Sequence, residues 1–181
     1  MSEYKIALLR GINVGGKRKI LMADLRALFE DLGFLEVKTY IQSGNVLFKS
    51  NTNKNNLSIG AAIAKAIEKK YTFDVPIVVL SVDELKEAVK INSYYTEDAD
   101  INNLHLTFLS ETPDNELLEN ILQLDYAPDV FDIKGRFVFL NILGKYHKTK
   151  LSNNLFEKKL KVSATTRNWK TVMKLLKLSE G

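Results

Sequence analysis

The chain has 181 residues, of which 45% are hydrophobic and 27% are charged, and its net charge is +4. This composition is ordinary for a globular protein and excludes a largely disordered chain. The chain contains no cysteine, which excludes disulfides, thiolate metal sites and a cysteine nucleophile. No segment approaches the roughly 18 apolar residues of a membrane span or has the pattern of a signal peptide. We therefore expect a cytoplasmic protein with no membrane partner.

Charge is segregated along the chain. Residues 1–70 carry 12 Lys/Arg against 6 Asp/Glu, residues 71–133 carry 2 against 14, and residues 134–181 carry 12 against 2, so the balances are +6, −12 and +10. A basic end segment complements an anionic partner such as a nucleotide or a nucleic acid, or it complements the acidic middle segment of the protein itself. The sequence leaves both interpretations open.

The first half of the chain begins with a predicted strand over Tyr4–Arg10, where side chains alternate as in a half-buried strand. A helix follows and Gly33 ends it; its leucines recur at helical spacing, namely Leu21, Leu25, Leu28 and Leu32. Two further strands, Val37–Ile41 and Val46–Phe48, flank Gln42-Ser43-Gly44-Asn45. The Gly-Asn centre of that segment predicts a tight hairpin turn.

A helix over Leu57–Lys70, a strand over Val75–Leu80 and a short amphipathic helix over Asp83–Val89 come next. The β-α-β-β-α-β order is that of the split βαβ, or ferredoxin-like, fold. We therefore assign residues 1–91 to a ferredoxin-like subdomain within an α+β protein. The polar stretch over residues 92–103 is assigned to a linker.

Residues 104–181 predict a second α+β subdomain. Three segments have strand patterns: Leu104–Leu109, Val130–Ile133 and Phe137–Leu140. Thr112, followed by Pro113, predicts the N-cap of a helix between the first two strands. This βαββ order repeats that of the first half. The apolar positions of the corresponding helices also match at a constant offset, as Leu25 and Leu117 do at 92 residues (117 − 25). The sequence thus predicts an internal duplication.

The second subdomain is predicted to end in two C-terminal helices and to lack a fourth strand. Ser152 is the predicted cap of a helix that reaches about Leu160, and Thr166 is the predicted cap of the last helix. The last helix has an apolar stripe made of Trp169, Val172, Met173 and Leu176. We interpret that stripe as core.

The stretch Arg10–Lys17, with the sequence Arg-Gly-Ile-Asn-Val-Gly-Gly-Lys, is the leading candidate site. Glycines and free N–H groups at a helix start favour an anion, and basic side chains add charge. The stretch resembles part of a P-loop, but Arg18 stands where a magnesium-binding hydroxyl is required. The predicted ligand contacts are Arg10, Asn13, Gly15, Gly16 and Lys17. The alternative is that the stretch only connects the strand to the helix, with glycines that satisfy the backbone geometry and basic side chains that are solvated.

Two other segments offer polar groups to the same ligand. Gln42, Ser43 and Asn45 present amide and hydroxyl groups, although these residues are also ordinary in turns. Arg167, in the predicted first turn of the last helix, opposes the helix dipole and suggests an anionic partner, which is either a ligand or an internal acid. Lys150 and Asn168 complete the predicted ligand-binding set.

Three motifs in order, Leu9–Lys17, Tyr40–Val46 and Ala164–Trp169, resemble the bacterial domain of unknown function 1697 family. The resemblance runs from end to end of the chain. It implies a cytoplasmic α+β protein of two related subdomains with no established reaction. Lys161 stands where glycine is usual in the family.

No catalytic residue, cofactor or metal is assigned. His105 lies within a strand pattern and His147 lies among lysines, and neither has a recognisable catalytic partner. The leading hypothesis is a protein that binds a small phosphorylated or nucleotide-like anion at Arg10–Lys17. The second is a protein-interaction or homodimerisation module, and the third is an enzyme of unassigned reaction or an RNA binder, with nucleic acid only weakly supported.

Overall fold

The structure is a computed structural model, and it describes residues 4–180. The fold is mixed α+β, with two four-stranded antiparallel sheets and six α-helices within those residues. The chain divides into two compact units, Met1–Leu85 with Leu175–Gly181, and Lys86–Lys174. None of the helices within residues 4–180 is long and apolar enough to cross a membrane.

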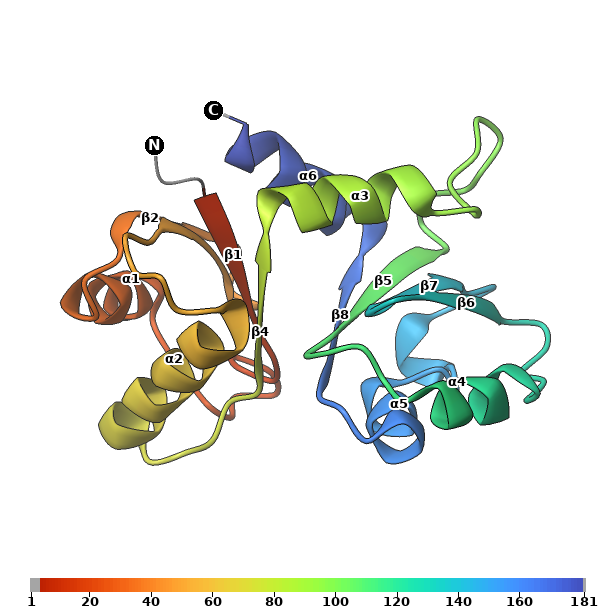
Figure 1. Cartoon of the computed structure of the whole chain (residues 1–181), viewed down its shortest axis with the longest axis horizontal. Helices are drawn as coiled ribbons and strands as arrows, with labels where there is room; N and C mark the ends of the chain where they lie inside the picture. The colour runs from red at the N-terminus through yellow and green to blue at the C-terminus, as the bar shows by residue number, and fades with distance from the viewer. Residues whose placement is uncertain (1–3, 181) are drawn as a thin grey trace. The chain divides into compact units, whose positions relative to one another are not determined.

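The first unit holds one sheet and two complete helices (Figure 1). Its elements are β1 (Tyr4–Leu9), α1 (Met22–Asp31), β2 (Leu35–Tyr40), β3 (Asn45–Lys49), α2 (Asn56–Tyr71) and β4 (Ile77–Ser81). The strand order is β2-β3-β1-β4. Both helices cover one face of the sheet, where Leu9, Phe29 and Ile63 belong to one apolar cluster.

β1 differs from the expected half-buried strand. Its last four side chains, those of residues 6–9, are all fully buried, so both of its faces are covered. A strand that is buried on both faces carries a continuous apolar run and shows no alternation. As a central strand with neighbours on both sides, β1 positions the segment that follows it.

The second unit holds the other sheet. Its elements are β5 (Leu104–Leu109), α4 (Asn115–Leu122), β6 (Val130–Lys134), β7 (Phe137–Asn141), the 3-10 helix η1 (Tyr146–Lys148), α5 (Asn153–Leu160) and β8 (Ala164–Asn168). The strand order is β6-β7-β5-β8. The unit boundaries fall within α3 (Val82–Ile91) and α6 (Trp169–Ser179).

β8 shows that the prediction of a second subdomain without a fourth strand was wrong. β8 pairs antiparallel with β5. Thr166 lies in this strand, where its Oγ1 is 2.6 Å from Oγ1 of Thr107, so it does not cap a helix. The cap of α6 is Asn168, whose Oδ1 accepts a 2.8 Å hydrogen bond from the N–H of Thr171. The segment Ala-Thr-Thr-Arg-Asn has no apolar alternation, so its pairing with β5 decides its structure.

The helix α4 begins later than the sequence indicated. Its N-cap is Asp114, which has helix-entry geometry but makes no side-chain cap hydrogen bond, and Thr112 lies outside the helix. The predicted cap at Thr112 was therefore wrong. Ser152 was predicted correctly, since its Oγ accepts a hydrogen bond from the N–H of Leu155 at the start of α5.

The two sheets make matching hydrogen bonds at the ends of their central strands. The N–H of Leu9, at the end of β1, donates to the carbonyl of Gly44 over 2.8 Å. The N–H of Leu109, at the end of β5, donates to the carbonyl of Arg136 over 2.9 Å. In both cases the acceptor directly precedes the next paired strand, so the two sheets share register as well as strand order.

Candidate functional site

The loop between β1 and α1 contains a small hairpin of its own. Val14 and Lys17 form an antiparallel bridge, and the N–H of Lys17 donates to the carbonyl of Val14 over 3.0 Å. Gly15 and Gly16 form the tip, with φ of 56° and 74°. Positive φ at both central residues is what a type I′ hairpin turn requires, and glycine adopts it without strain.

This geometry corrects the expectation that the glycines lie at a helix start. The helix α1 begins only at Met22, and its N-cap is Leu21. Gly15 and Gly16 therefore receive nothing from a helix dipole. Both are exposed, and their N–H groups make no hydrogen bond to any residue between 4 and 180.

Asn13 holds the loop closed. Its Nδ2 donates to the carbonyl of Ile20 over 2.9 Å and to the carbonyl of Gln42 over 3.0 Å, and its Oδ1 accepts from the N–H of Ile20 over 2.9 Å. Its backbone has a φ of 56°, a conformation that asparagine tolerates better than most residues. We call Asn13, Ile20 and Gln42 the Asn13 clip. The side-chain amide of Asn13, which was predicted to contact a ligand, makes internal hydrogen bonds within this clip.

The β2–β3 turn lies against the loop because Gly44 allows close approach. A Cβ at Gly44 would lie 2.7 Å from Cβ of Leu9 and 2.9 Å from Cδ1 of Ile12. With the Asn13 clip, this contact brings the first two predicted motifs to the same end of the first sheet, since β1 ends at Leu9 and β3 begins at Asn45. The fold thus groups these predicted residues.

The three predicted polar residues of the turn have different surroundings. Gln42 is exposed and Ser43 is half-buried. Asn45 is fully buried, and its Nδ2 donates to the carbonyl of Tyr40 over 3.0 Å and to Oγ of Ser43 over 3.1 Å. Asn45 therefore stabilises the turn, while Gln42 is the side chain most open to a ligand.

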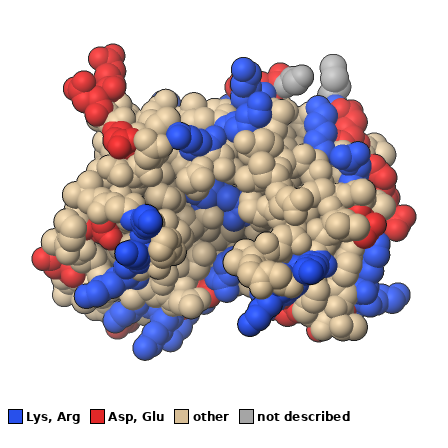
Figure 2. Space-filling model, turned by 180° about the vertical axis from the view of Figure 1, so that it is seen from behind, with Lys and Arg blue, Asp and Glu red and all other residues tan. Residues whose placement is uncertain are grey.

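The loop is strongly basic. Lys17, Arg18 and Lys19 are exposed and Arg10 is half-buried. The sequence has no Asp or Glu from residue 4 to residue 23. The residues predicted from the sequence include Lys17 but not Arg18 or Lys19, although the run of three basic residues was visible. The molecular face drawn in Figure 2 carries both basic and acidic side chains.

The other predicted residues belong to the second unit. Arg167 is buried in β8, where one guanidinium nitrogen donates to the carbonyl of Thr166 over 3.0 Å. Burial lowers the pKa of Arg167 to about 10, while Tyr146 acts in the opposite direction. Asn168 is the cap of α6, and Lys150 is exposed.

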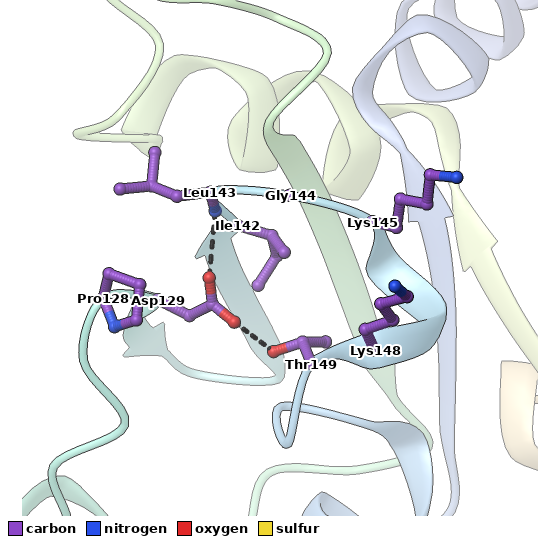
Figure 3. Close-up of a pocket in the computed structure, with 8 residues that line it drawn as sticks. All are labelled: Pro128, Asp129, Ile142, Leu143, Gly144, Lys145, Lys148 and Thr149. Atoms are coloured by element: carbon purple, nitrogen blue, oxygen red, sulfur yellow. Dashed lines mark hydrogen bonds between the residues drawn. The ribbon is translucent and has the colours of Figure 1, made fainter.

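A cavity of about 220 Å³ lies between two loops of the second unit (Figure 3). Its lining residues are Pro128, Asp129, Ile142, Leu143, Gly144, Lys145, Lys148 and Thr149. The carboxylate of Asp129 joins the loops, since it accepts hydrogen bonds from the N–H of Leu143 over 2.9 Å and from Oγ1 of Thr149 over 2.5 Å. An adjoining cavity of about 230 Å³ is lined by several of the same residues and by Lys150.

His105 has the surroundings of a structural residue. It is 8% exposed, its ring stacks on Tyr146 with centroids 4.8 Å apart, and its Nδ1 lies 3.2 Å from the carbonyl of Asn103. Burial lowers its pKa, which favours the neutral ring. Within residues 4–180, no three His, Asp or Glu side chains are grouped so that they could hold a metal ion.

A family model described as "Protein of unknown function (DUF1697)" matches residues 1–139 of the chain. The chain belongs to the DUF1697 family. No curated protein matches it. A solved structure, that of the conserved bacterial protein SP0830 from Streptococcus pneumoniae, is similar over 99% of both chains, with 25% identity and a TM-score of 0.74.

The DUF1697 match covers the first two motifs and ends before the third. The loop after β1 and the β2–β3 turn lie inside the matched residues, whereas Lys150 and Ala164–Trp169 lie outside them. The similarity to SP0830 extends over the whole chain, including β8. Family membership supplies no reaction, so any function must be argued from the geometry.

Proposed function

We propose that the protein binds a small anionic ligand, phosphorylated or nucleotide-like, at the basic loop, which we define as residues 10–19. The observation that carries this proposal is the exposed, acid-free hairpin that the hydrogen bonds of Asn13 hold closed. Lys17, Arg18 and Lys19 supply positive charge, and the N–H groups of Gly15 and Gly16 are open donors. Because the Asn13 clip holds the hairpin in place, little conformational entropy is lost on binding.

The predicted residues take two kinds of role in this proposal. Lys17, Gly15, Gly16 and Gln42 contact the ligand, together with Arg10 and Ser43 at the base of the loop. Asn13 and Asn45 position the loop and the turn, since their amides are engaged there. The predicted contacts Lys150, Arg167 and Asn168 belong to the second unit, so the site proposed here is confined to residues of the first unit. The expected location remains the cytoplasm.

We also propose that each half has the ferredoxin-like fold and that the halves arose by duplication. Support comes from the shared strand order and from a matching pair of caps. Oγ of Ser81 accepts from the N–H of Glu84 at the start of α3, as Oδ1 of Asn168 accepts from Thr171 at the start of α6. In this comparison the second half has no counterpart of the basic loop, because only five residues separate Leu109 from Asn115. That difference favours a function at the loop.

The proposal is tested by titrating the protein with pyrophosphate in an isothermal calorimeter. We expect the double variant Lys17→Gln/Arg18→Gln to weaken binding by at least about tenfold, since a hydrogen bond to a charged group contributes about 1.5–3 kcal/mol. The melting temperature should not change, because both side chains are exposed. The control is Lys158→Gln/Lys159→Gln, which removes the same charge from exposed positions of α5. Equal losses in both variants would show nonspecific attraction and no site.

A second candidate function, self-association, is favoured by the surface of α4. Glu116 and Glu119 are exposed there, and Leu122 is 51% exposed in the same helix. A surface that carries two acidic side chains and an exposed leucine complements the basic loop of a second copy. Such a contact joins two different surfaces of the chain.

A further inference from the structure

Three exposed aliphatic residues are the chain neighbours of the Asn13 clip residues. Val14 is 65% exposed, Leu21 is 71% exposed and Ile41 is 47% exposed. Val14 follows Asn13, Leu21 follows Ile20 and Ile41 precedes Gln42, so the hydrogen bonds of Asn13 hold the backbone next to all three residues close together. Single exposed apolar residues are ordinary on protein surfaces, whereas a group of them marks a contact surface.

Ile41 is also held in an unfavourable backbone conformation. Its φ is 49°, in the left-handed region, which β-branched residues rarely adopt. Its side chain is half exposed, so burial does not offset this strain. Strained residues of this kind occur preferentially where a side chain is presented to a ligand or partner.

The cations of the basic loop share this surface. Val14 and Lys17 are directly opposite in the small hairpin, and side chains of opposed residues lie on the same face. Arg18 and Lys19 follow at once and are exposed. The surface, which we call the loop tip, thus combines Val14, Leu21 and Ile41 with Lys17, Arg18 and Lys19.

We propose that the loop tip binds the surface of an anionic lipid bilayer, with the cations on the phosphate headgroups and the three aliphatic side chains in the interfacial layer. The inference rests on the proposed function, because it names the source of the anion. A small group of aliphatic side chains beside cations suits such an interface, where apolar burial and attraction to anionic lipids add together.

A nucleic acid fits the loop tip less well. Binding to single strands uses aromatic side chains on which bases stack. Neither residues 10–21 nor residues 41–44 contain an aromatic side chain. The aliphatic side chains of the loop tip are removed from water in a lipid interface, which is favourable, whereas a phosphate backbone offers them no apolar contact.

This contact departs from the sequence-based expectation of no membrane partner. That expectation rested on the lack of a spanning segment, and a surface contact needs none. In the sequence, Leu21 belongs to the leucine pattern of α1 and Ile41 belongs to a strand pattern, so both are expected to be buried. Their exposure becomes visible only in the fold.

The test is sedimentation of the full chain with vesicles of phosphatidylglycerol and phosphatidylcholine in equal parts, and with vesicles of phosphatidylcholine alone. We expect binding only to the anionic vesicles, weakening as salt rises. Leu21→Gln should lower the vesicle partition coefficient by about tenfold, as expected for a leucine that leaves water. Leu143→Gln, at a leucine of the second unit that is 59% exposed, is the matched control and should change nothing.

Pyrophosphate titration of the same variants separates the two proposals. Leu21→Gln should bind pyrophosphate as the unsubstituted chain does, whereas Lys17→Gln/Arg18→Gln should lose both pyrophosphate and vesicles. If pyrophosphate binds and anionic vesicles do not, the lipid inference is overturned and the proposed function stands. If neither binds, both fail. Binding of an RNA oligonucleotide without binding of vesicles, or equal effects of Leu21→Gln and Leu143→Gln, also overturns the lipid inference.

Discussion

At the scale of single residues, the glycines near the loop serve two different physical purposes. Gly16 has a φ of 74° and open space around it, so glycine is needed there only for backbone conformation. Gly44 has a φ of 83° and no room for a Cβ beside Leu9. A methyl group at position 44 would therefore lower the stability of the fold more than a methyl group at position 16.

This difference predicts unequal effects of alanine on the free energy of unfolding. Gly44→Ala should lower it by about 3 kcal/mol, because overpacking adds to left-handed strain. Gly16→Ala should lower it by only about 1 kcal/mol, the cost of the conformation alone. Urea denaturation of both variants checks this. Equal losses would mean that the close approach of the turn to Leu9 contributes nothing to stability.

Asn13 and Asn45 show that residue type alone does not decide whether a side chain binds a ligand or stabilises the fold. Both were expected to contact a ligand, because a primary amide offers a directional donor and acceptor. The structure commits both amides to internal hydrogen bonds, one to Gln42 and one to Tyr40. An amide that stabilises a loop and an amide that binds a ligand look the same in a sequence. Only the position of the acceptor separates them.

At the scale of elements, the end of α5 carries an identifiable strain. Its C-cap is Lys161, which has a φ of 59°, in the left-handed region. Glycine is the usual residue at a helix end in this conformation, because it has no Cβ and adopts the conformation at no steric cost.

Lys161→Gly should therefore stabilise the protein by about 0.5–1 kcal/mol, since relief of about 1–2 kcal/mol of left-handed strain exceeds the added entropy of the unfolded chain. The control is Lys159→Gly, inside α5, which should destabilise by about 1 kcal/mol. Thermal denaturation of the two variants is the measurement. A lowered melting temperature for Lys161→Gly would contradict this account of the cap.

β8 marks the limit of prediction at this scale. Elements with a clear hydrophobic periodicity were predicted well. An example is α2, whose buried isoleucines recur at helical spacing. β8 is short and polar, and it becomes a strand because β5 supplies its hydrogen-bonding partners. Propensity is a weak prior where tertiary pairing decides, so Thr166 was taken for a helix cap.

At the scale of the whole molecule, the segregation of charge along the chain bears on association. The acidic middle segment and the basic segments on either side differ by many charges, with balances of −12, +6 and +10. On the face shown in Figure 2 both signs are present. A contact between copies that joins the basic loop to the acidic α4 would be held largely by screened Coulomb attraction.

The self-association candidate predicts that the mass measured by light scattering falls as salt is raised from about 0.1 M to 1 M, because the Debye length falls from about 10 Å to about 3 Å. Glu116→Lys/Glu119→Lys should lower the mass at low salt, and adding Lys17→Glu/Arg18→Glu should restore it. A mass that is independent of salt and of these substitutions would exclude this candidate.

The sequence by itself determined the order of most elements, the Ser152 cap and the family, because these depend on periodicity, local capping and motif order. The tertiary structure decided the fourth strand of the second sheet, the role of Asn13 and the exposure of Leu21 and Ile41. Each of these depends on groups that are distant in the chain. A hydrogen-bond partner such as Gln42 for Asn13, 29 residues away, is specified by the fold and has no local signal.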